Sequence, residues 1–458
     1  MKRNLTSQLL DWIDKPNRKP LVLRGARQVG KTWLVRDFAI KAKLRLVEMN
    51  FEKQIDSASI FRSNDPKKIL QLLEAHLRTS IVPNQTLLFL DEIQAAPEIL
   101  SKLRWFKEDM PELAVIATGS LLDFALENHQ FSMPVGRISY LYLEPLSYFE
   151  FLNAIGESRL CTILKEVTLN TEIDSSLHNR CLEILTLYSL IGGMPEVVHQ
   201  WVSDGNMAEC QSLQRDLLKT YRDDFHKYGK ADPKLLQKTF HSIAVQLGGK
   251  FIASRVDGSA TLNAVQKIIQ LLTMARVNTN VAMTSAVGLP LGSCVNEKFY
   301  KALFLDVGLV SSQLGLCEIP SEEVSKITLG NKGAIAEQFV GQQLRSARIN
   351  HDDSFLYYWQ RTGGRQGEVD YVIQNAGDIL PIEVKAGASG SMKSLHQFMF
   401  DKNLTRAIRF DSNNLSVADI ELKTTQGDHV RYEMISLPLY LAERTFELLL
   451  RGKSSIRV

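Results

Sequence analysis

The chain has 458 residues, of which 45% are hydrophobic and 23% are charged, and its formal net charge is +3. This composition is that of a globular protein with two to four domains, and it excludes a disordered or collagen-like chain. A net charge so close to balance does not by itself indicate a nucleic-acid partner, so that inference must rest on local motifs.

The five cysteines and the apolar segments narrow the class of protein further. The cysteine number is odd, and none has CxxC spacing or a nearby paired histidine, which argues against a disulfide framework or a structural zinc site. The first twenty residues include Asp11 and Asp14 and lack a long apolar run, and no later stretch reaches about 18 uninterrupted apolar residues. We therefore expect a cytoplasmic protein with no membrane partner.

Residues 1–155 alternate helical and strand patterns, and we expect them to form one domain. A short amphipathic helix ends at Pro16, and Pro20 opens the apolar strand "LVL". The strands that follow are "LRLVEMNF", "TLLFLD" and "LAVIATGS", with helices expected between them at about 30–43, 67–78 and 98–107. This alternation predicts an α/β domain with a parallel sheet covered by helices.

The segment "GARQVGKT" matches GxxxxGK[ST] and lies between a predicted strand and a predicted helix. Its backbone N–H groups and the helix N-terminus suit a multiply charged anion. Lys31 is expected to reach the β- and γ-phosphates of ATP, and Thr32 to ligate Mg²⁺ through its hydroxyl. The alternative is a glycine-rich turn with a chance lysine. The predicted nucleotide-binding residues are Gly25, Ala26, Arg27, Gln28, Val29, Gly30, Lys31 and Thr32.

Two later strands of this domain also end in polar residues. "LLFLD" ends in Asp91, which is expected to hold the hydrated Mg²⁺, and Glu92 follows as the residue that polarises the attacking water. "AVIATGS" ends in Thr118 and Ser120, which could hydrogen-bond a γ-phosphate or the water beside Glu92. A solvated strand end and a turn cap are the alternatives for the two pairs.

Arg137 follows these strands, in "PVGRISYLYLEPLSYFEF". It could act as an arginine finger on ATP held by its own chain or by a neighbouring subunit. An ordinary surface arginine is the alternative. A homo-oligomer or a protein partner is therefore a candidate assembly, and a hexamer is not assumed.

In order along the chain, "GARQVGKT", "FLDEIQ" and "ATGS" resemble the AAA+ branch of the P-loop ATPases. Together with "PVGRISYLYLEPLSYFEF", "GGMPEVV" and "KFYKALFLDVGLV", the P-loop also resembles a large group of bacterial and archaeal ATPases with a C-terminal domain of unknown function. This resemblance covers nearly the whole chain. It implies ATP binding and a nuclease-like C-terminal domain. No second sensor arginine is recognisable after the predicted lid.

The rest of the chain divides into three predicted regions. Residues 156–245 have mostly helical spacing and are expected to form a helical lid or linker. Residues 246–285 have a helical face followed by alternation, which could form a winged helix that reads DNA or merely joins domains. Residues 286–458 mix helix and strand and are expected to form a second α/β domain.

A second candidate site lies in "GEVDYVIQNAGDILPIEVKAG", which predicts a β-hairpin. Glu383 and Lys385 alternate with apolar neighbours, so a strand places their side chains on one face. Asp370 lies on the partner strand, and Glu337 lies on a predicted helix upstream. Clustered carboxylates can bind Mg²⁺ and lower the pKa of a bound water, which Lys385 could position or deprotonate.

Asp370, Glu383 and Lys385 together resemble the PD-(D/E)XK nuclease motif, and Glu337 matches the helix glutamate of that superfamily. The literal "PD" is absent, because Val369 precedes Asp370. The resemblance implies a PD-(D/E)XK-like fold, with Glu337, Asp370 and Glu383 as metal ligands. An alternating strand with a surface Glu–Lys pair is the alternative, and folds of this type also persist as inactive binding modules.

We expect an ATPase whose nucleotide cycle controls a C-terminal nuclease-like domain that cleaves or binds DNA. The catalytic residues would be Glu92 in the first domain and Asp370, Glu383 and Lys385 in the second, with ATP and Mg²⁺ as cofactors. The alternative is a nucleotide-controlled switch or scaffold whose C-terminal domain is catalytically inactive and serves recognition.

Overall fold

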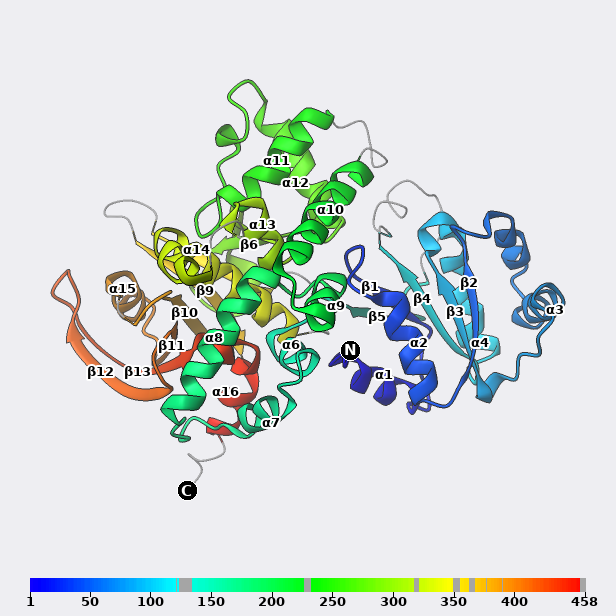
Figure 1. Cartoon of the computed structure of the whole chain (residues 1–458), viewed down its shortest axis with the longest axis horizontal. Helices are drawn as coiled ribbons and strands as arrows, with labels where there is room; N and C mark the ends of the chain where they lie inside the picture. The colour runs from blue at the N-terminus through cyan, green and yellow to red at the C-terminus, as the bar shows by residue number, and fades with distance from the viewer. Residues whose placement is uncertain are drawn as a thin grey trace. The chain divides into compact units, whose positions relative to one another are not determined.

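The computed structural model describes residues 1–120, 122, 134–225, 232–316, 321–348, 355–361, 367–375, 377–388 and 390–453. The chain divides into two compact units (Figure 1). Unit 1 contains Met1–Glu144 and Met274–Arg276, and unit 2 contains Pro145–Thr273 and Val277–Val458. The expected helical region 156–245 therefore belongs to the same unit as the C-terminal sheet. Within the described ranges, no helix is long and apolar enough to cross a membrane.

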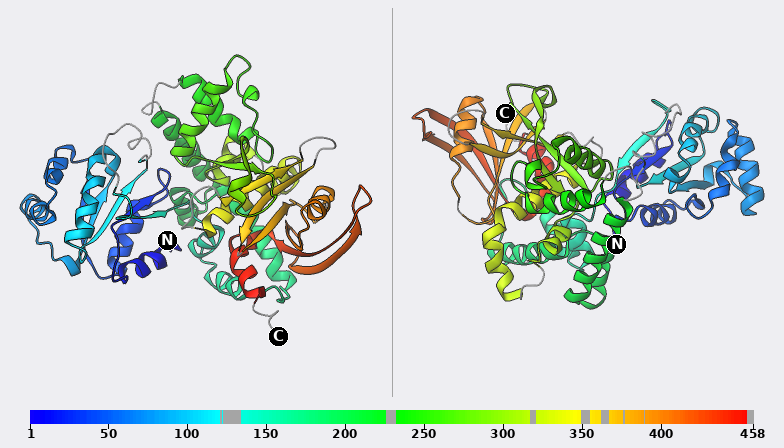
Figure 2. Two further views of the ribbon diagram at one scale, coloured as in Figure 1. Left: turned by 180° about the vertical axis from the view of Figure 1, so that it is seen from behind. Right: turned by 90° about the horizontal axis from the view of Figure 1, so that it is seen from above.

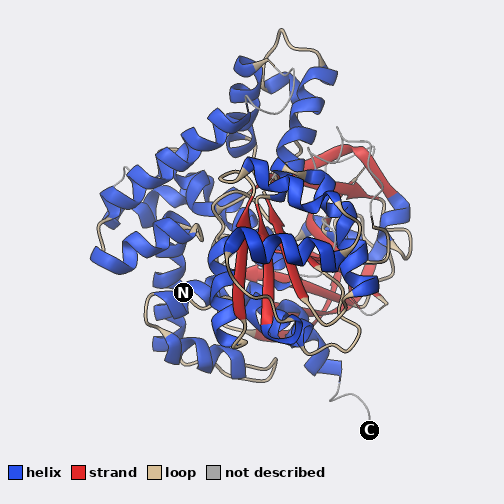
Figure 3. Cartoon of the chain, turned by 90° about the vertical axis from the view of Figure 1, so that its right-hand side faces the viewer, coloured by secondary structure: helices blue, strands red, loops and turns tan. Residues whose placement is uncertain are grey.

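Unit 1 is built on a five-stranded parallel sheet with the strand order β2-β3-β4-β1-β5. Helices lie in front of its strands in Figure 3. Its strands are β1 (Leu21–Arg24), β2 (Arg45–Asn50), β3 (Thr86–Asp91), β4 (Ala114–Gly119) and β5 (Ser139–Tyr142). Every residue of β3 and β4 is buried, as expected for central strands covered on both faces. The parallel α/β sheet predicted for this part of the chain is confirmed.

Helices cover this sheet, and α2 packs on β2, β3 and β4. The helices of unit 1 are α1 (Leu5–Ile13), α2 (Lys31–Lys41), α3 (Pro66–Leu77) and α4 (Leu103–Asp109), with 3₁₀ turns η1 (Ile55–Arg62), η2 (Pro83–Gln85), η3 (Ile93–Ala95) and η4 (Pro97–Lys102). Because all five strands are parallel, the carboxyl ends of β1, β2, β3 and β4 meet at one edge of the sheet. The predicted nucleotide residues follow these ends.

Unit 2 is built on an eight-stranded mixed sheet with the order β12-β13-β11-β10-β9-β8-β6-β7. The strands are β6 (Asn278–Thr284), β7 (Val295–Phe304), β8 (Tyr357–Gln360), β9 (Glu368–Asn375), β10 (Asp378–Val384), β11 (Arg406–Asp411), β12 (Ser416–Lys423) and β13 (His429–Pro438). β9 and β10 form the predicted antiparallel hairpin, and β12 and β13 form a long hairpin at the sheet edge (Figure 2). The expected boundary at 285/286 falls between β6 and β7, which pair with each other.

Some helices of unit 2 pack on this sheet, and α14 contacts β7 and β10. They are α6 (Tyr148–Ala154), α7 (Ser158–Glu166), α8 (Ser175–Ile191), α9 (Pro195–Asp204), α10 (Met207–Phe225), α11 (Pro233–Val245), α12 (Leu262–Met274), α13 (Val307–Gln313), α14 (Ser321–Ala347), α15 (Lys393–Asp401) and α16 (Thr445–Lys453), with η5 (Ala253–Arg255), η6 (Leu291–Cys294) and η9 (Leu439–Arg444). The described residues of 156–245 form helices joined by turns and irregular loops, with no strand.

Asp306, which is fully buried, joins three segments of unit 2. Its Oδ1 accepts hydrogen bonds from the backbone N–H groups of Gly308 and Leu309 in the first turn of α13. Its Oδ2 accepts from the backbone N–H of Gly193 at 2.7 Å and from Gln342 Nε2 of α14 at 3.0 Å. A Cβ atom at Gly192 would overlap Asp306 Oδ1, so a side chain cannot be accommodated there. The segments "GGMPEVV" and "LDVGLV" therefore meet in a buried structural network, where burial raises the pKa of Asp306.

Candidate nucleotide site and carboxylate cluster

The loop between β1 and α2 is held in an unusual backbone conformation. Gly25, Gln28 and Gly30 have φ values of 154°, 62° and 94°. A Cβ atom at Gly25 would overlap the backbone carbonyl of Leu143, which explains the glycine at that position. α2 begins at Lys31, directly after Gly30, so the loop leads into a helix N-terminus. This is the backbone arrangement that binds phosphate groups.

Lys31 is buried, and its ammonium folds back onto the loop. Its Nζ donates hydrogen bonds to the carbonyl oxygens of Gly25, at 3.0 Å, and Ala26, at 2.8 Å. Burial lowers the pKa of Lys31 to about 8, although the nearby Glu92 and Asp91 act in the opposite direction. Neutral carbonyls are weaker partners for an ammonium than phosphate oxygens. Lys31 therefore lies where an anion would improve its hydrogen bonding.

Asp91 is the centre of a hydrogen-bond network at the carboxyl edge of the sheet. Its Oδ2 accepts from Thr32 Oγ1 at 3.1 Å and from Asn50 Nδ2 at 3.2 Å. Its Oδ1 accepts from the Thr118 hydroxyl and from the backbone N–H of Glu92 at 3.1 Å. Asn50 was not predicted from the sequence. It is in register with Asp91 on the neighbouring strand β2, and that register was the signal that could have identified it.

The Thr32 hydroxyl and the Asp91 carboxylate form the hard-oxygen donor set that Mg²⁺ requires beside a nucleotide. They lie within hydrogen-bonding distance of each other, and Asp91 is held by three further donors. The residues at this position therefore fit a magnesium ion.

Glu92 occupies the left-handed region of the backbone, with φ 53°. This conformation is uncommon for glutamate and is often found at functional sites. Its Oε2 accepts a hydrogen bond from Gln94 Nε2 at 2.6 Å, and the same Nε2 lies 3.2 Å from Glu52 Oε1. Burial raises the pKa of Glu92, which makes its carboxylate a stronger base than an exposed glutamate. Gln94 is a second residue that the sequence interpretation missed.

Thr118 and Ser120 were predicted together, but the structure gives them different surroundings. The Thr118 hydroxyl donates to Asp91 Oδ1 and so orients that carboxylate. The Ser120 side chain is buried, and its Oγ has no hydrogen-bond partner among the residues that the structure describes. Ser120 is therefore the better placed of the two to contact a bound group.

Two arginines of unit 1 bear on the arginine-finger prediction. Arg137 is half exposed and its Nε donates to Glu108 Oε1 at 2.7 Å. It precedes β5, whose first residue, Ser139, is in register with Leu21 at the start of β1. The P-loop follows the end of β1, so Arg137 lies at the opposite edge of the sheet from the P-loop of its own chain. Its action on a neighbouring subunit stays a prediction.

Arg276 was not predicted from the sequence. It is buried in unit 1, its Nη2 lies 3.0 Å from Glu144 Oε1, and its guanidinium lies 4.4 Å from the centre of the Tyr142 ring. Its positive charge contributes to the lowered pKa of Lys31, after burial and alongside Arg27. A buried cation thus faces the nucleotide loop from a segment remote in sequence, for which no local motif gave a signal.

In unit 2, the β9–β10 hairpin brings Asp370 and Glu383 together. The register pairs Tyr371 with Ile382, so Asp370 and Glu383 are the next positions on the two strands. Asp370 Oδ2 accepts from the backbone N–H of Val384 at 2.8 Å, and Glu383 Oε1 accepts from Lys385 Nζ at 2.5 Å. Glu383 Oε2 is buried without a hydrogen-bond partner in the described part of the chain. These contacts place the three hairpin residues of the predicted cluster side by side.

Lys301 of β7 also enters this cluster, and the sequence interpretation did not include it. Its side chain is 3% exposed, and its Nζ lies 3.1 Å from Glu337 Oε2, 2.5 Å from Glu368 Oε1 and 3.6 Å from Asp370 Oδ1. Glu337 comes from α14, which packs on β7, so the helix glutamate does reach the cluster. Glu368 is a further carboxylate that was not predicted.

The cluster changes the protonation of its members. Burial alone would lower the pKa of Lys301, but the three carboxylates around it raise that pKa well above its usual value. Burial, with the Asp370 charge, raises the pKa of Glu337 and brings the pKa of Glu383 to about 7. Lys301 is therefore charged at every physiological pH, whereas Glu383 titrates near neutrality.

The carboxylates predicted as metal ligands do not fit a divalent ion in this arrangement. The Lys301 ammonium already contacts both Glu337 and Asp370. Across the described residues, no group of three or more His, Cys, Asp or Glu side chains is arranged to hold a metal ion. No catalytic step through a metal is therefore derived for this cluster.

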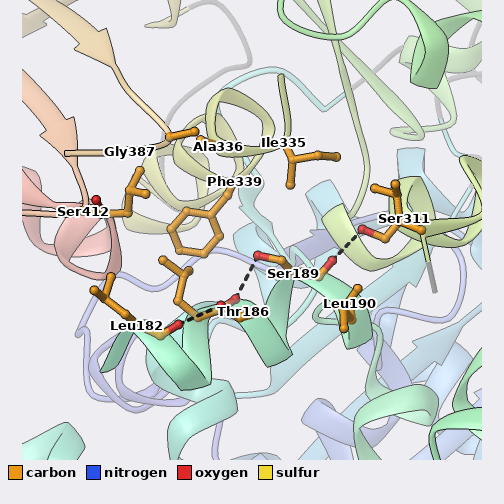
Figure 4. Close-up of a pocket in the computed structure, with 14 residues that line it drawn as sticks. Leu182, Thr186, Ser189, Leu190, Ser311, Ile335, Ala336, Phe339, Gly387 and Ser412 are labelled. Carbon is orange, nitrogen blue, oxygen red and sulfur yellow. Dashed lines mark hydrogen bonds between the residues drawn. The ribbon is translucent and has the colours of Figure 1, made fainter. Parts of the chain in front are cut away.

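Unit 2 also contains an apolar pocket of about 310 Å³, formed by residues of α8, α13, α14 and η9 (Figure 4). Phe339 of α14 lies opposite Leu182 of α8 in this pocket, and Ile335 of α14 also lines it. Three of its hydroxyl groups are already engaged: Ser311 Oγ donates to the carbonyl of Ser189 at 2.7 Å, and Ser189 and Thr186 donate to carbonyls of their own helix. Most of the residues that line the pocket are apolar, and none of them is charged.

Comparisons with known proteins identify the first unit more clearly than the second. Residues 17–152 match the family described as AAA domain, whereas residues 182–318 and 332–439 match two families described only as domains of unknown function (DUF8612 and DUF4143). Unit 1 thus contains a P-loop ATPase domain of the AAA type. Neither domain of unknown function identifies a nuclease, so the likeness of unit 2 to PD-(D/E)XK enzymes stays a prediction.

Two solved structures resemble parts of the chain. The Walker-type ATPase PABY2304 of Pyrococcus abyssi is 15% identical, with a TM-score of 0.43, and the match covers 68% of this chain and 95% of that protein. PCH-2 of C. elegans is 14% identical, with a TM-score of 0.25, and the match covers 41% of this chain and 58% of that protein. A comparison with curated proteins found no match.

Proposed function

We propose that the protein is a magnesium-dependent ATPase whose nucleotide cycle controls its C-terminal unit. The observation that carries this proposal is the Asp91 network, which joins the end of β3 to Thr32 of the P-loop helix and to Thr118 of β4. In this scheme Lys31 leaves the loop carbonyls and binds the β- and γ-phosphates. Thr32 and Asp91 are the residues that would hold Mg²⁺, and the ion would supply positive charge beside the phosphate oxygens.

Glu92 is the proposed base. Its raised pKa and its hydrogen bond from Gln94 support this role, because a partly buried carboxylate held by one amide can orient a water and accept its proton. Ser120 is proposed to contact the γ-phosphate or that water. Thr118 keeps Asp91 in position.

The test is the substitution Glu92→Gln, which keeps the size of the side chain and removes the base. The variant should bind ATP as tightly as the wild type, while phosphate release slows by about 10²- to 10⁴-fold. Glu98→Gln, an exposed glutamate close by in the sequence, is the matched control and should hydrolyse ATP normally. Hydrolysis at the wild-type rate by Glu92→Gln would contradict the assigned base.

For the C-terminal unit we propose recognition of a partner, with DNA as the predicted ligand, and not cleavage. The ion pairs of Lys301 with Glu337 and Asp370 support this choice, because they use the carboxylates that a metal-dependent nuclease needs free. The second candidate, a Mg²⁺-dependent nuclease, is favoured by one observation. Glu383 has an unpartnered oxygen within the described residues and a pKa of about 7, and it lies beside Lys385.

The two candidates differ in one assay. Supercoiled, single-stranded and branched DNA would be incubated with the wild type, ATP and either Mg²⁺ or Mn²⁺. Intact DNA, with binding detected by mobility shift, supports recognition. Cleavage that is lost in Lys385→Ala, while ATP turnover persists, would establish the nuclease instead.

A further inference from the structure

Several elements of unit 2 contact the side chain of Lys301 in the carboxylate cluster. It lies on β7 in register with Val281 of β6, and its ammonium lies 5.6 Å from the centre of the Tyr358 ring. The carboxylates around it come from two other elements, Glu337 from α14 and Glu368 and Asp370 from β9. A lysine is rarely buried unless it is paired, so these carboxylates account for its position.

The ammonium occupies the place that a divalent ion would take among the same oxygens. Its Nζ lies between 2.5 and 3.6 Å from one oxygen of each of the three carboxylates. Mg²⁺ and Ca²⁺ bind such oxygens at about 2.0–2.6 Å, so an ion and the ammonium cannot share this space. Moving Lys301 out would break its three ion pairs and leave the carboxylates without the positive charge that compensates them.

We propose that Lys301 is the resident cation of the Glu337–Glu368–Asp370 cluster, and that its ammonium keeps a latent divalent-cation site closed. The inference rests on one part of the proposed function, that the C-terminal unit recognises a partner and does not cleave DNA, and it gives a physical reason for that part. It makes no use of the ATPase site. Glu383, whose Oε2 is buried without a partner among the described residues, is a further oxygen donor that the opened site would use.

The experiment measures Mn²⁺ binding by calorimetry on nucleotide-free full-length protein. The variant Lys301→Met removes the charge and keeps the length of the side chain, and Lys298→Met, an exposed lysine of the same strand, is the matched control. Lys301→Met should bind Mn²⁺ about 100-fold more tightly than the wild type, because a positive charge within a few Å of the ion is gone. Adding Asp370→Asn to Lys301→Met should abolish the gain.

The outcomes separate the inference from the proposed function. Wild type and Asp370→Asn should give the same Mn²⁺ titration, and a difference between them would overturn the inference even if Lys301→Met does not fold. Wild-type binding that disappears in Asp370→Asn overturns the inference, as does Lys301→Met that folds and binds no more Mn²⁺ than Lys298→Met. DNA cleavage by wild-type protein that binds no Mn²⁺ at the cluster would refute recognition and leave the closed site standing.

Discussion

Among the residues that the structure describes, each unit buries one lysine beside acidic side chains, and the two lysines have different partners. Lys31 of unit 1 donates to two backbone carbonyls, and burial lowers its pKa to about 8. Lys301 of unit 2 contacts three carboxylates, which together raise its pKa well above the usual value despite its burial. The first ammonium has neutral partners that an anion can replace, and the second is already neutralised.

This difference shows why similar residue types in a sequence can have unlike roles. A buried lysine that lacks a carboxylate partner loses part of its hydration energy and regains it when a phosphate binds. A buried lysine within a carboxylate cluster already has charged partners that compensate its lost hydration, so a phosphate would not readily replace them. The contrast predicts that nucleotide binding depends strongly on Lys31. Lys301 is expected to act only on the carboxylates that surround it.

The largest effect is expected from Lys31→Met, which removes the ammonium at the nucleotide loop. ATP turnover should fall by about 10²- to 10³-fold or more, because a charge-assisted contact to the transferred phosphate is lost. Phosphate release under saturating Mg²⁺ and ATP is the measurement. Lys385→Ala, in the other unit, should leave ATP turnover unchanged. An equal loss of turnover in both variants would contradict the assignment of phosphate binding to Lys31.

A second prediction concerns Glu383, whose pKa is raised from 4.5 to about 7 by burial and by Asp370. The folded state keeps a proton that the unfolded chain has released, so this contribution to stability is complete below pH 4.5 and is lost as the pH rises through 7. The loss should be on the order of 2–3 kcal/mol in the local stability of β9 and β10. Hydrogen exchange of their amides measures it.

Glu383→Gln is the control for that pH dependence, because a glutamine does not titrate. Between pH 4.5 and 7 the wild type should lose protection relative to this variant. If the two proteins keep the same difference in protection at every pH, Glu383 is not the titrating group.

The smallest effect is expected from the pair at the end of β4. Ser120→Ala should lower kcat by about 10- to 100-fold with little change in ATP affinity, since its contact forms only around the reacting phosphate. Thr118→Val should instead raise the Mg²⁺ concentration needed for half-maximal activity, because Asp91 Oδ1 loses one of its two hydrogen bonds. Titrating Mg²⁺ in steady-state assays of both variants separates the roles, and identical profiles would contradict them.

The sequence was most informative where function follows local spacing. The P-loop glycines, Lys31 and Thr32 lie within one turn and one helix start, so their arrangement follows from the motif alone. Asp91 and Glu92 could be assigned because a buried strand ends there. The hairpin that carries Asp370 and Glu383 was also predictable, since alternation and a Gly-containing turn define it.

What the sequence did not reveal depends on contacts between distant elements. Asn50 reaches Asp91 through strand register, and Lys301 reaches Glu337 through the packing of α14 on β7. An alternating strand carries no sign that one of its lysines is buried. The segments around Gly193 and Asp306 were noted as motifs, but only the structure explains them, as a buried network with Gln342.

The central claim is that the loop at Lys31 binds a nucleoside triphosphate. An equilibrium titration of the wild-type protein with a fluorescent ATP analogue and Mg²⁺ tests it most directly. The account predicts saturable binding at one site per chain that unlabelled ATP displaces and that Lys31→Met weakens. A wild-type protein with no saturable binding would contradict it.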